Sequence, residues 1–442
     1  MSSEKKLDAS PDSSPGNIDI DIEFAPNTAN ANAGDGQTSL KRGLKPRHVG
    51  MFSIAGAIGT GLLISSGTAL SRGGPGSMLI AYSFVGLLVL NIMSALGEMA
   101  VFMPMDKGFG GYASRLVDPA FGFATGMNYF LKYVVLLANN LTASGIVMQY
   151  WLPDVNVAVW VVSFAVIVIF INFMPVEYFG ETEFVAACIK TITIVGLMIL
   201  CLVIDLGGSS QGRIGFRYWN RPGAFKEYLE PDSMGRFLGF WACVTNASFA
   251  YMGSEMVDIY VASRTLYGLA KDGYAPSFFK FTKRSIPVFA VAAASAFFLL
   301  ALLNINSGSA VVFGYLVSLS TILGLLNWVS ILVTYLFFQK GMRVQGVGRD
   351  VLPFTGHFTQ IRAQITLFFT LLIILTSGFS SFVHKFQPIT FVVNYVGIVL
   401  YVFSFVSYKF IRRTKFVGFR EMNITTNIVT KQYVEELERD IS

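Results

Sequence analysis

The chain has 442 residues, of which 53% are hydrophobic and only 14% are charged. This composition is too apolar for an ordinary soluble protein and predicts a polytopic membrane protein. The formal net charge of +6 would suit a nucleic-acid partner, but the basic residues cluster beside apolar segments, as membrane topology requires, so no nucleic acid is expected.

The cysteines give no sign of a metal or disulfide framework. Cys188, Cys201 and Cys243 all lie inside apolar segments and lack the spacing of metal ligands. We therefore expect inert thiols, no metal site and no cofactor.

The N-terminal region differs in composition from the rest of the chain. Residues 1–43 are rich in Ser, Asp, Asn, Gly and Pro, which predicts a disordered tail. Four basic residues near the first apolar segment place this tail in the cytoplasm by the positive-inside rule: Lys41, Arg42, Lys45 and Arg47.

Apolar segments long enough to cross a bilayer then follow one another over residues 44–408, the expected permease domain, before a cytoplasmic tail at 409–442. About ten spans, an even number, put the C-terminus in the cytoplasm as well. The loop 207–236 is the exception to the charge rule, because it is expected outside yet carries Arg213, Arg217, Arg221 and Lys226. The spans are predicted near 48–70, 77–101, 120–150, 157–175, 184–206, 237–270, 287–304, 310–338, 365–383 and 389–408.

The first span contains a predicted break at Gly59, Thr60 and Gly61. Irregular backbone at membrane depth survives only where it lines a cavity or binds something. Two glycines beside a threonine let the chain unwind, and N–H groups at the start of the next half-helix favour an anion such as a carboxylate. The alternative is close helix packing through the small residues Gly56, Ala57 and Gly61.

The sixth span contains a second predicted break, between Asn246 and Glu255. Gly253 and Ser254 permit unwinding, which would leave carbonyl groups from Ser248 to Tyr251 able to accept from an ammonium group. Two broken helices that hold a zwitterion near the bilayer midplane are typical of inverted-repeat transporters. Close packing is again the alternative for this glycine.

Ionisable residues inside spans are costly and are candidates for function. Glu98, Lys132, Lys190 and Glu255 are the four that stand out. A lysine can extend its ammonium toward the interface, so a structural role is favoured for Lys132. Lys190 lies about a turn into its span, where a desolvated ammonium would respond to protons.

Several sequence motifs resemble those of the fungal amino-acid permeases of the amino acid/polyamine/organocation superfamily. They occur in the same order as in that family, from about residue 44 to 420. They are Leu44-Lys-Pro-Arg-His-Val, Gly59-Thr-Gly, Leu96-Gly-Glu-Met, Tyr112-Ala-Ser-Arg-Leu-Val-Asp-Pro, Gln149-Tyr-Trp, Ile189-Lys-Thr-Ile, Gly215-Phe-Arg-Tyr-Trp-Asn-Arg-Pro-Gly-Ala-Phe and Ser263-Arg-Thr-Leu-Tyr-Gly-Leu-Ala.

The resemblance implies an all-α broken-helix fold with two inverted repeats and twelve spans, which takes up amino acids with protons at the plasma membrane. Thr60 and Gly61 would bind the substrate carboxylate, and the backbone of Ser248, Phe249, Ala250 and Tyr251 its amino group, with Phe249 as the gating aromatic. Lys190, Glu98 and Glu255 are the expected proton-coupling groups.

Two departures from the family pattern matter. Asn140 stands where many members carry a glutamate, which disfavours cationic substrates because a pairing carboxylate is absent. The chain also passes directly from Val257 to Asp258, so a block around the seventh and eighth spans is missing, with a junction near 255–260. About ten spans instead of twelve result.

The leading prediction is proton-coupled symport of neutral amino acids, impaired by the missing block. The alternative is a receptor of permease fold that binds an amino acid and signals without useful transport. An enzyme is not expected, since His48, His357 and His384 are scattered and no catalytic cluster is seen. The sequence fixes neither the amino acid carried nor the oligomeric state.

Overall fold

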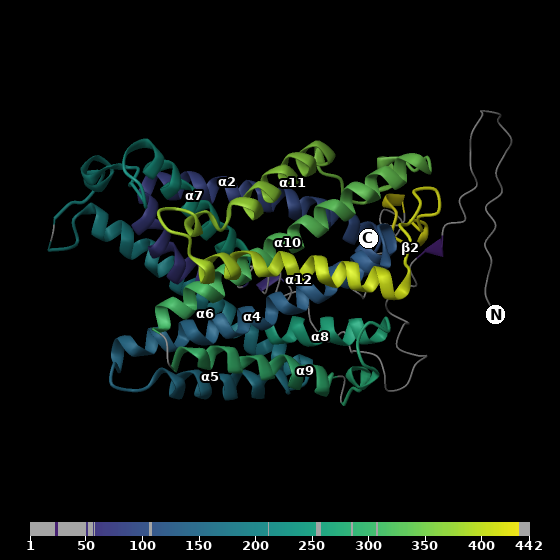
Figure 1. Ribbon diagram of the computed structural model, residues 1–442, viewed down its shortest axis with the longest axis horizontal. Helices are drawn as coiled ribbons and strands as arrows, with labels where there is room; N and C mark the ends of the chain where they lie inside the picture. Colours follow the sequence, from purple (N-terminus) through teal and green to yellow (C-terminus); the bar gives the residue numbers. More distant parts are fainter. Residues whose placement is uncertain are drawn as a thin grey trace, which may run out of the picture.

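A computed structural model describes residues 23–24, 50–51, 56, 58–105, 108–210, 212–252, 258–283, 286–305 and 308–432. Most of the predicted N-terminal tail lies outside the described residues. Long helices lie side by side along the molecule, with the C-terminus at one end and the connection from α6 to α7 at the other (Figure 1). The architecture is all-α, apart from a short parallel pairing of strand β1 (Glu23–Phe24) with β2 (Thr426–Ile428).

The helices follow one another in the order expected from the apolar segments. They are η1 (Gly61–Ser65), α2 (Ser66–Phe102), α3 (Gly108–Leu116), α4 (Pro119–Trp151), α5 (Val157–Asn172), α6 (Val176–Leu206), η2 (Trp219–Gly223), α7 (Asp232–Ala250), α8 (Asp258–Lys271), η4 (Ser277–Lys280), α9 (Val288–Ala296), η5 (Phe297–Ile305), α10 (Ser309–Val344), η6 (Arg349–Val351), α11 (Thr359–Thr376), η7 (Phe379–Ser381) and α12 (Pro388–Arg412).

Helix α2 reverses direction between the first two predicted spans. Gly74 has φ 80° and ψ 173°, a conformation that glycine adopts without strain, and Pro75 follows it. The loop before α7 fixes this turn, because Gly76 N donates to Ala224 O at 2.8 Å and Lys226 N donates to Gly73 O at 2.9 Å. The turn inside α2 and the loop before α7, which are far apart in the sequence, therefore lie against each other at the end opposite the C-terminus.

The predicted sixth span is divided in two. Helix α7 ends at Ala250 and packs against α2, whereas α8 begins at Asp258 and packs against α4 and α9. The helix thus ends inside the segment where the sequence predicts a break. Glu255 and the glycine expected to cause the unwinding lie outside the described residues.

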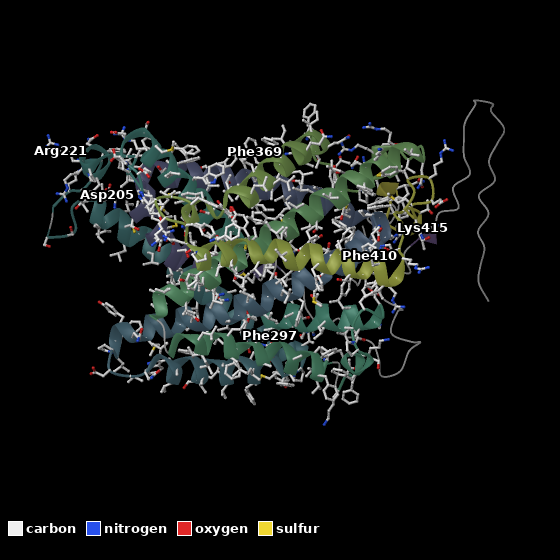
Figure 2. All side chains as sticks on the ribbon, in the orientation of Figure 1. Asp205, Arg221, Phe297, Phe369, Phe410 and Lys415 are labelled. Carbon is white, nitrogen blue, oxygen red and sulfur yellow. The ribbon has the colours of Figure 1, made fainter. Side chains whose placement is uncertain are left out.

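The described helices have the length and apolarity of membrane spans. Charged side chains such as Asp205, Arg221 and Lys415 gather at the two ends, and apolar ones such as Phe297 and Phe369 lie between them (Figure 2). The helices long and apolar enough to cross a membrane are Gly61–Phe102, Pro119–Trp151, Tyr178–Leu206, Ala310–Val344, Thr359–Ser381 and Pro388–Arg412, and Val157–Asn172 and Val288–Leu303 are shorter apolar helices. The chain is a multi-pass membrane protein.

Helix α6 differs from the others in its packing. Only 6% of its most apolar stretch is buried, compared with 72% for α4 and for α10. Ile192 and Met198 are 72% and 66% exposed. Lipid can cover an apolar helix face. Helix α6 also carries Lys190, however, so the low burial of this helix matters for the candidate site described below.

The segment after α12 folds back onto the bundle. Arg115 Nε donates to Asn423 O at 2.7 Å, and Gln345 Nε2 donates to Met422 O at 2.7 Å. The side chain of Ile424 is buried at 1% exposure. The predicted tail 409–442 is therefore packed over at least part of its length, and it joins α3 to the end of α10.

Candidate functional site

The predicted break in the first span is visible as a change of helix type. The five residues of η1 form a π-helical turn, an irregularity that is rare and often found at functional sites. The carbonyl of Gly59 accepts from both Leu62 N and Leu63 N at 3.1 Å. The start of a helix therefore lies at Gly59, Thr60 and Gly61, where the dipole favours an anion.

Gly61 also serves close packing. A Cβ at this position would stand 2.5 Å from the Ala250 Cα and 3.0 Å from its backbone nitrogen, which is closer than real atoms approach. The two broken helices thus touch through their backbones, as the packing alternative requires. Gly59 is different, because a Cβ there would meet no heavy atom of the described residues within 4 Å.

A cavity of about 320 Å³, which we call the Gly59 cavity, joins the two breaks. Its volume falls within the range of small-molecule sites. The first-span break contributes Gly59, Thr60 and Gly61, and the end of α7 contributes Phe249 and Ala250. Helices α4, α5 and α6 complete the wall with Asn140, Asn172, Glu183 and Lys190 among the polar residues.

Asn140 contacts the first-span break directly. The Thr60 hydroxyl donates to Asn140 Oδ1 at 3.0 Å, across 80 residues of sequence. This bond orients an amide, not a carboxylate, toward the cavity. Asn140 therefore offers no carboxylate to pair with a positively charged substrate side chain.

Lys190 and Glu183 are the ionisable side chains among the described residues that line the Gly59 cavity. Seven positions apart on α6, they lie two turns from each other on the same face of the helix. The sequence analysis selected Lys190 and missed Glu183. The i, i+7 spacing from Lys190 is the signal that could have found it.

Three predicted site residues lie away from the cavity or outside the described residues. The Ser248 side chain is fully buried and donates to Val244 O of its own helix at 2.9 Å. The Tyr251 ring faces Tyr82, with 6.4 Å between ring centroids. Glu255 lies outside the described residues.

Glu98, the remaining proton-coupling candidate, lies near the C-terminal end of the molecule, apart from the Gly59 cavity. Its carboxylate is fully buried and accepts from five groups. They are Tyr335 Oη at 2.6 Å, Gln339 Nε2 at 3.2 Å, Arg349 Nη2 at 2.8 Å, Gly356 N at 2.8 Å and Thr359 Oγ1 at 2.7 Å. So many donors favour a charged, structural carboxylate.

Lys132 is fully buried in α4, yet it reaches the second break. Its Nζ donates to Met252 O at 3.3 Å, just beyond the end of α7, and lies 4.8 Å from the centre of the Tyr133 ring. A cation beside the last carbonyl groups of a helix complements the helix dipole. The ammonium therefore does not extend to the membrane interface, where the sequence led us to expect it, and the structural role of Lys132 stays a prediction.

Comparison with known proteins identifies the family. The amino acid permease family model matches residues 48–259 and 258–420, which together cover most of the chain. The chain belongs to the amino acid permease family. It is 39% identical to an uncharacterized amino-acid permease of Schizosaccharomyces pombe over 85% of this chain and 90% of that protein.

Other relatives carry names with different substrates. The dicarboxylic amino acid permease of Saccharomyces cerevisiae is 36% identical over 89% of this chain and 81% of its own length. A probable proline-specific permease of Schizosaccharomyces pombe is 32% identical over 86% of this chain and 87% of its own length.

Membership of the amino acid permease family settles the class of function. Permeases are transporters and not enzymes. Amino-acid transport across a membrane is the function of this class. Which amino acid, and what drives its movement, depends on the cavity.

Proposed function

We propose that this amino acid permease carries neutral α-amino acids together with protons across the plasma membrane. The observation that supports this most is the Gly59 cavity itself. It brings both helix breaks, Asn140 and Lys190 to one space of about 320 Å³. We propose the plasma membrane as its location because the sequence resembles the fungal amino-acid permeases.

The backbone of the two breaks suits a zwitterion. The N-terminal end of η1 would hold the carboxylate at Gly59, Thr60 and Gly61, because the helix dipole is positive there. The C-terminal end of α7, at Phe249 and Ala250, would face the ammonium group with its carbonyls. Opposite helix ends then hold the opposite charges of one substrate.

Lys190 is the group proposed to respond to protons. Its ammonium lines the same cavity, so a change in its charge would alter the potential that the substrate meets. Glu183, on the same face of α6, is a candidate partner in this exchange. Glu98 is proposed instead as a structural carboxylate, since it lies in a separate cluster.

Both termini are proposed to be cytoplasmic. The last turns of α8, α10 and α12 carry the basic residues Lys271, Arg343 and Arg412, and the C-terminal segment lies at the same end of the molecule. An excess of Lys and Arg marks the cytoplasmic side. A receptor without useful transport draws no support from the relatives named above, which carry permease names.

Asn140 provides the test of substrate class. With an amide there, proline, alanine or leucine should compete for uptake or binding better than lysine or arginine, because a desolvated cation would lack a partner. Asn140→Glu should raise the competition by arginine about tenfold or more, since a buried charge pair replaces an uncompensated charge.

The measurement is competition by a panel of amino acids against one radiolabelled neutral amino acid, in vesicles that contain the chain. Asn172→Glu, in the same cavity but on α5, is the matched control and should not produce the same gain for arginine. Stronger competition by arginine than by neutral amino acids in the unmodified chain would overturn the assignment. Stronger competition by aspartate would point instead to the substrate class named for the yeast dicarboxylic relative.

A further inference from the structure

A second cavity lies toward the end of the molecule opposite the C-terminus. We call it the Arg72 cavity. It has a volume of about 390 Å³, within the range of ligand sites, and it lies between the start of α2, helix α7, helix α10 and the connection from α11 to α12. The function proposed above makes no use of it.

The Arg72 cavity and the Gly59 cavity follow each other along the same two helices. The Gly59 cavity uses Gly61 and Ala250, whereas the Arg72 cavity uses Thr68 and Asn246, each one or two turns nearer the end opposite the C-terminus. Their other walls differ, because α4, α5 and α6 line the first, and α10 and α12 line the second. They are therefore separate spaces beside a shared pair of helices.

Arg72 gives this cavity its charge. Among the described residues that line it, Arg72 is the charged one, and its guanidinium lies 5.4 Å from the centre of the Tyr228 ring. Within the described part of the chain, no carboxylate pairs with it. The nearby acids have other partners, since Glu227 pairs with Arg236 at 3.5 Å and Glu230 with His384 at 3.4 Å.

The uncharged walls offer acceptors. Thr245 Oγ1 and Asn246 Nδ2 both donate to Ala242 O of their own helix, at 3.0 Å and 3.2 Å, and Thr321 Oγ1 donates to Val317 O at 2.6 Å. With the threonine O–H groups and one N–H of Asn246 used inside the helices, the hydroxyl and amide oxygens of these side chains keep lone pairs that can accept from a ligand. The cavity thus combines one strong cationic donor with several acceptors.

We propose that the Arg72 cavity is a second binding site for α-amino acids, which holds the carboxylate on Arg72 and the ammonium group on oxygen atoms of α7 and α10. A guanidinium binds a carboxylate in a two-pronged geometry that an ammonium cannot match. The site deepens the proposed transport function, because an amino acid that enters from this end would meet Arg72 before the helix breaks.

The test places a reactive thiol in the Arg72 cavity. Ser318→Cys, on α10, introduces a cysteine that differs from serine by one atom, at a partly exposed position that lines the cavity. Its rate of modification is measured with an anionic reagent, sulfonatoethyl methanethiosulfonate, and a cationic one, trimethylammonioethyl methanethiosulfonate. The parent chain, which retains Cys188, Cys201 and Cys243, gives the background.

A mixture of the common L-amino acids other than cysteine, whose thiol would consume the reagents, serves as the protecting probe, so that the identity of the substrate need not be known. The mixture should slow modification of the Ser318→Cys chain by about tenfold, and the corresponding amino-acid amides, which lack the carboxylate, should not. Adding Arg72→Gln should abolish the protection and lower the ratio of the anionic to the cationic rate. Arg236→Gln, at the same end of the molecule, should change neither.

Gly59→Val separates this proposal from the proposed function. A side chain at Gly59 would fill the Gly59 cavity and leave protection at Ser318→Cys intact if the two sites are distinct. Protection that survives Arg72→Gln, or the absence of protection in the Ser318→Cys chain with Arg72 intact, would overturn the second site. Loss of protection with Gly59→Val alone would show that the reporter senses the Gly59 cavity, and would overturn it too.

Discussion

Gly59 and Gly61 belong to the same broken segment, but their surroundings differ. A side chain at Gly61 would collide with the backbone of Ala250, so its substitution would separate two packed helices. A side chain at Gly59 would enter open space in the cavity. Gly59 is therefore the position at which binding can be tested without disturbing helix packing.

We expect Gly59→Val to weaken binding of amino acids by tenfold or more, because the added methyl groups occupy the proposed carboxylate site. Binding to purified protein is the measurement, and thermal unfolding is the check on folding. Gly196→Val, on α6, is the matched control, since a Cβ there also meets nothing within 4 Å. Binding as tight as in the unmodified chain would contradict the carboxylate assignment.

Lys190→Ala should remove the pH dependence of uptake or of binding, because alanine cannot gain or lose a proton. Lys190→Arg should keep the charge at all accessible pH values, and so should also flatten the pH profile while binding persists. Lys226→Ala, a lysine outside the cavity that bonds to Ser71 O, serves as the control. A pH profile unchanged in both Lys190 variants would place the coupling at another group.

At the residue scale, residue type predicted which positions line the Gly59 cavity, whereas the directions of side chains depend on the helix geometry; the predicted role of the backbone carbonyls from Ser248 to Tyr251 stays a prediction. Glycine spacing and the cost of a charge in hydrocarbon selected Gly59, Thr60 and Lys190, and all three line one cavity. Ser248 and Tyr251 were grouped with Phe249 because the backbone was expected to unwind there. Helix α7 continues to Ala250, and its rotation turns both side chains elsewhere.

Among the elements, Glu98 shows how one buried carboxylate can join several helices. It lies near the end of α2 and accepts from Tyr335 and Gln339 of α10, from Arg349 of η6 and from the start of α11. The nearby Tyr112 phenol, on α3, has its pKa raised to about 12 by burial, stays neutral and donates to Met103 O at 2.6 Å. Polar bonds therefore fix the helices at this end.

Glu98→Gln should lower stability by roughly 3 kcal/mol, because it removes the charge of a fully buried carboxylate that pairs with Arg349 and turns two acceptor oxygens into one oxygen and one donor. Glu227→Gln breaks an exposed pair with Arg236 and should cost under about 1 kcal/mol. Thermal unfolding in detergent compares the two. Unchanged stability of Glu98→Gln, together with loss of the pH dependence of uptake, would restore Glu98 as a coupling group.

Hydrophobic length predicted most of the elements but not how they pack. The apolar segments at 120–150, 310–338 and 389–408 correspond to α4, α10 and α12, because a span needs about 20 apolar residues whatever its neighbours are. The fold-back of the C-terminal segment escaped the sequence analysis. Its contacts, such as Gln345 with Phe419 and Met422, join residues more than 70 positions apart, and no local pattern encodes them.

For the molecule as a whole, the junction between α7 and α8 is where we infer a difference between this chain and its relatives. The family match divides at residues 258 and 259, where α8 begins. The alignment with the Schizosaccharomyces pombe relative runs over 470 residues although it takes in 85% of this 442-residue chain, so that relative carries residues that this chain lacks. We infer that a block near the seventh and eighth spans is absent.

The absence of this block would explain why so little of α6 is buried. Helix α6 is the least buried of the long apolar helices, and Lys190 is exposed on it. In hydrocarbon, a lysine needs a polar partner or a watery cavity. The proposed coupling group would thus be held less firmly than in a permease with the full set of helices.

The absence of the block leads to a prediction about transport. Removing one pair of spans leaves every later helix with its orientation across the membrane, so the chain should insert normally. Helices α6 and α7 nevertheless lose neighbours that satisfy polar groups and hold the cavity in shape. We therefore expect the chain as written to reach the membrane but to transport amino acids poorly, in cells that lack other permeases. Inserting the corresponding block of the Schizosaccharomyces pombe relative after Val257 should raise uptake, whereas an insert of equal length made of Gly and Ser should not. Strong proton-coupled uptake by the chain as written would show that the remaining helices suffice, and that α6 needs no further partner to position Lys190.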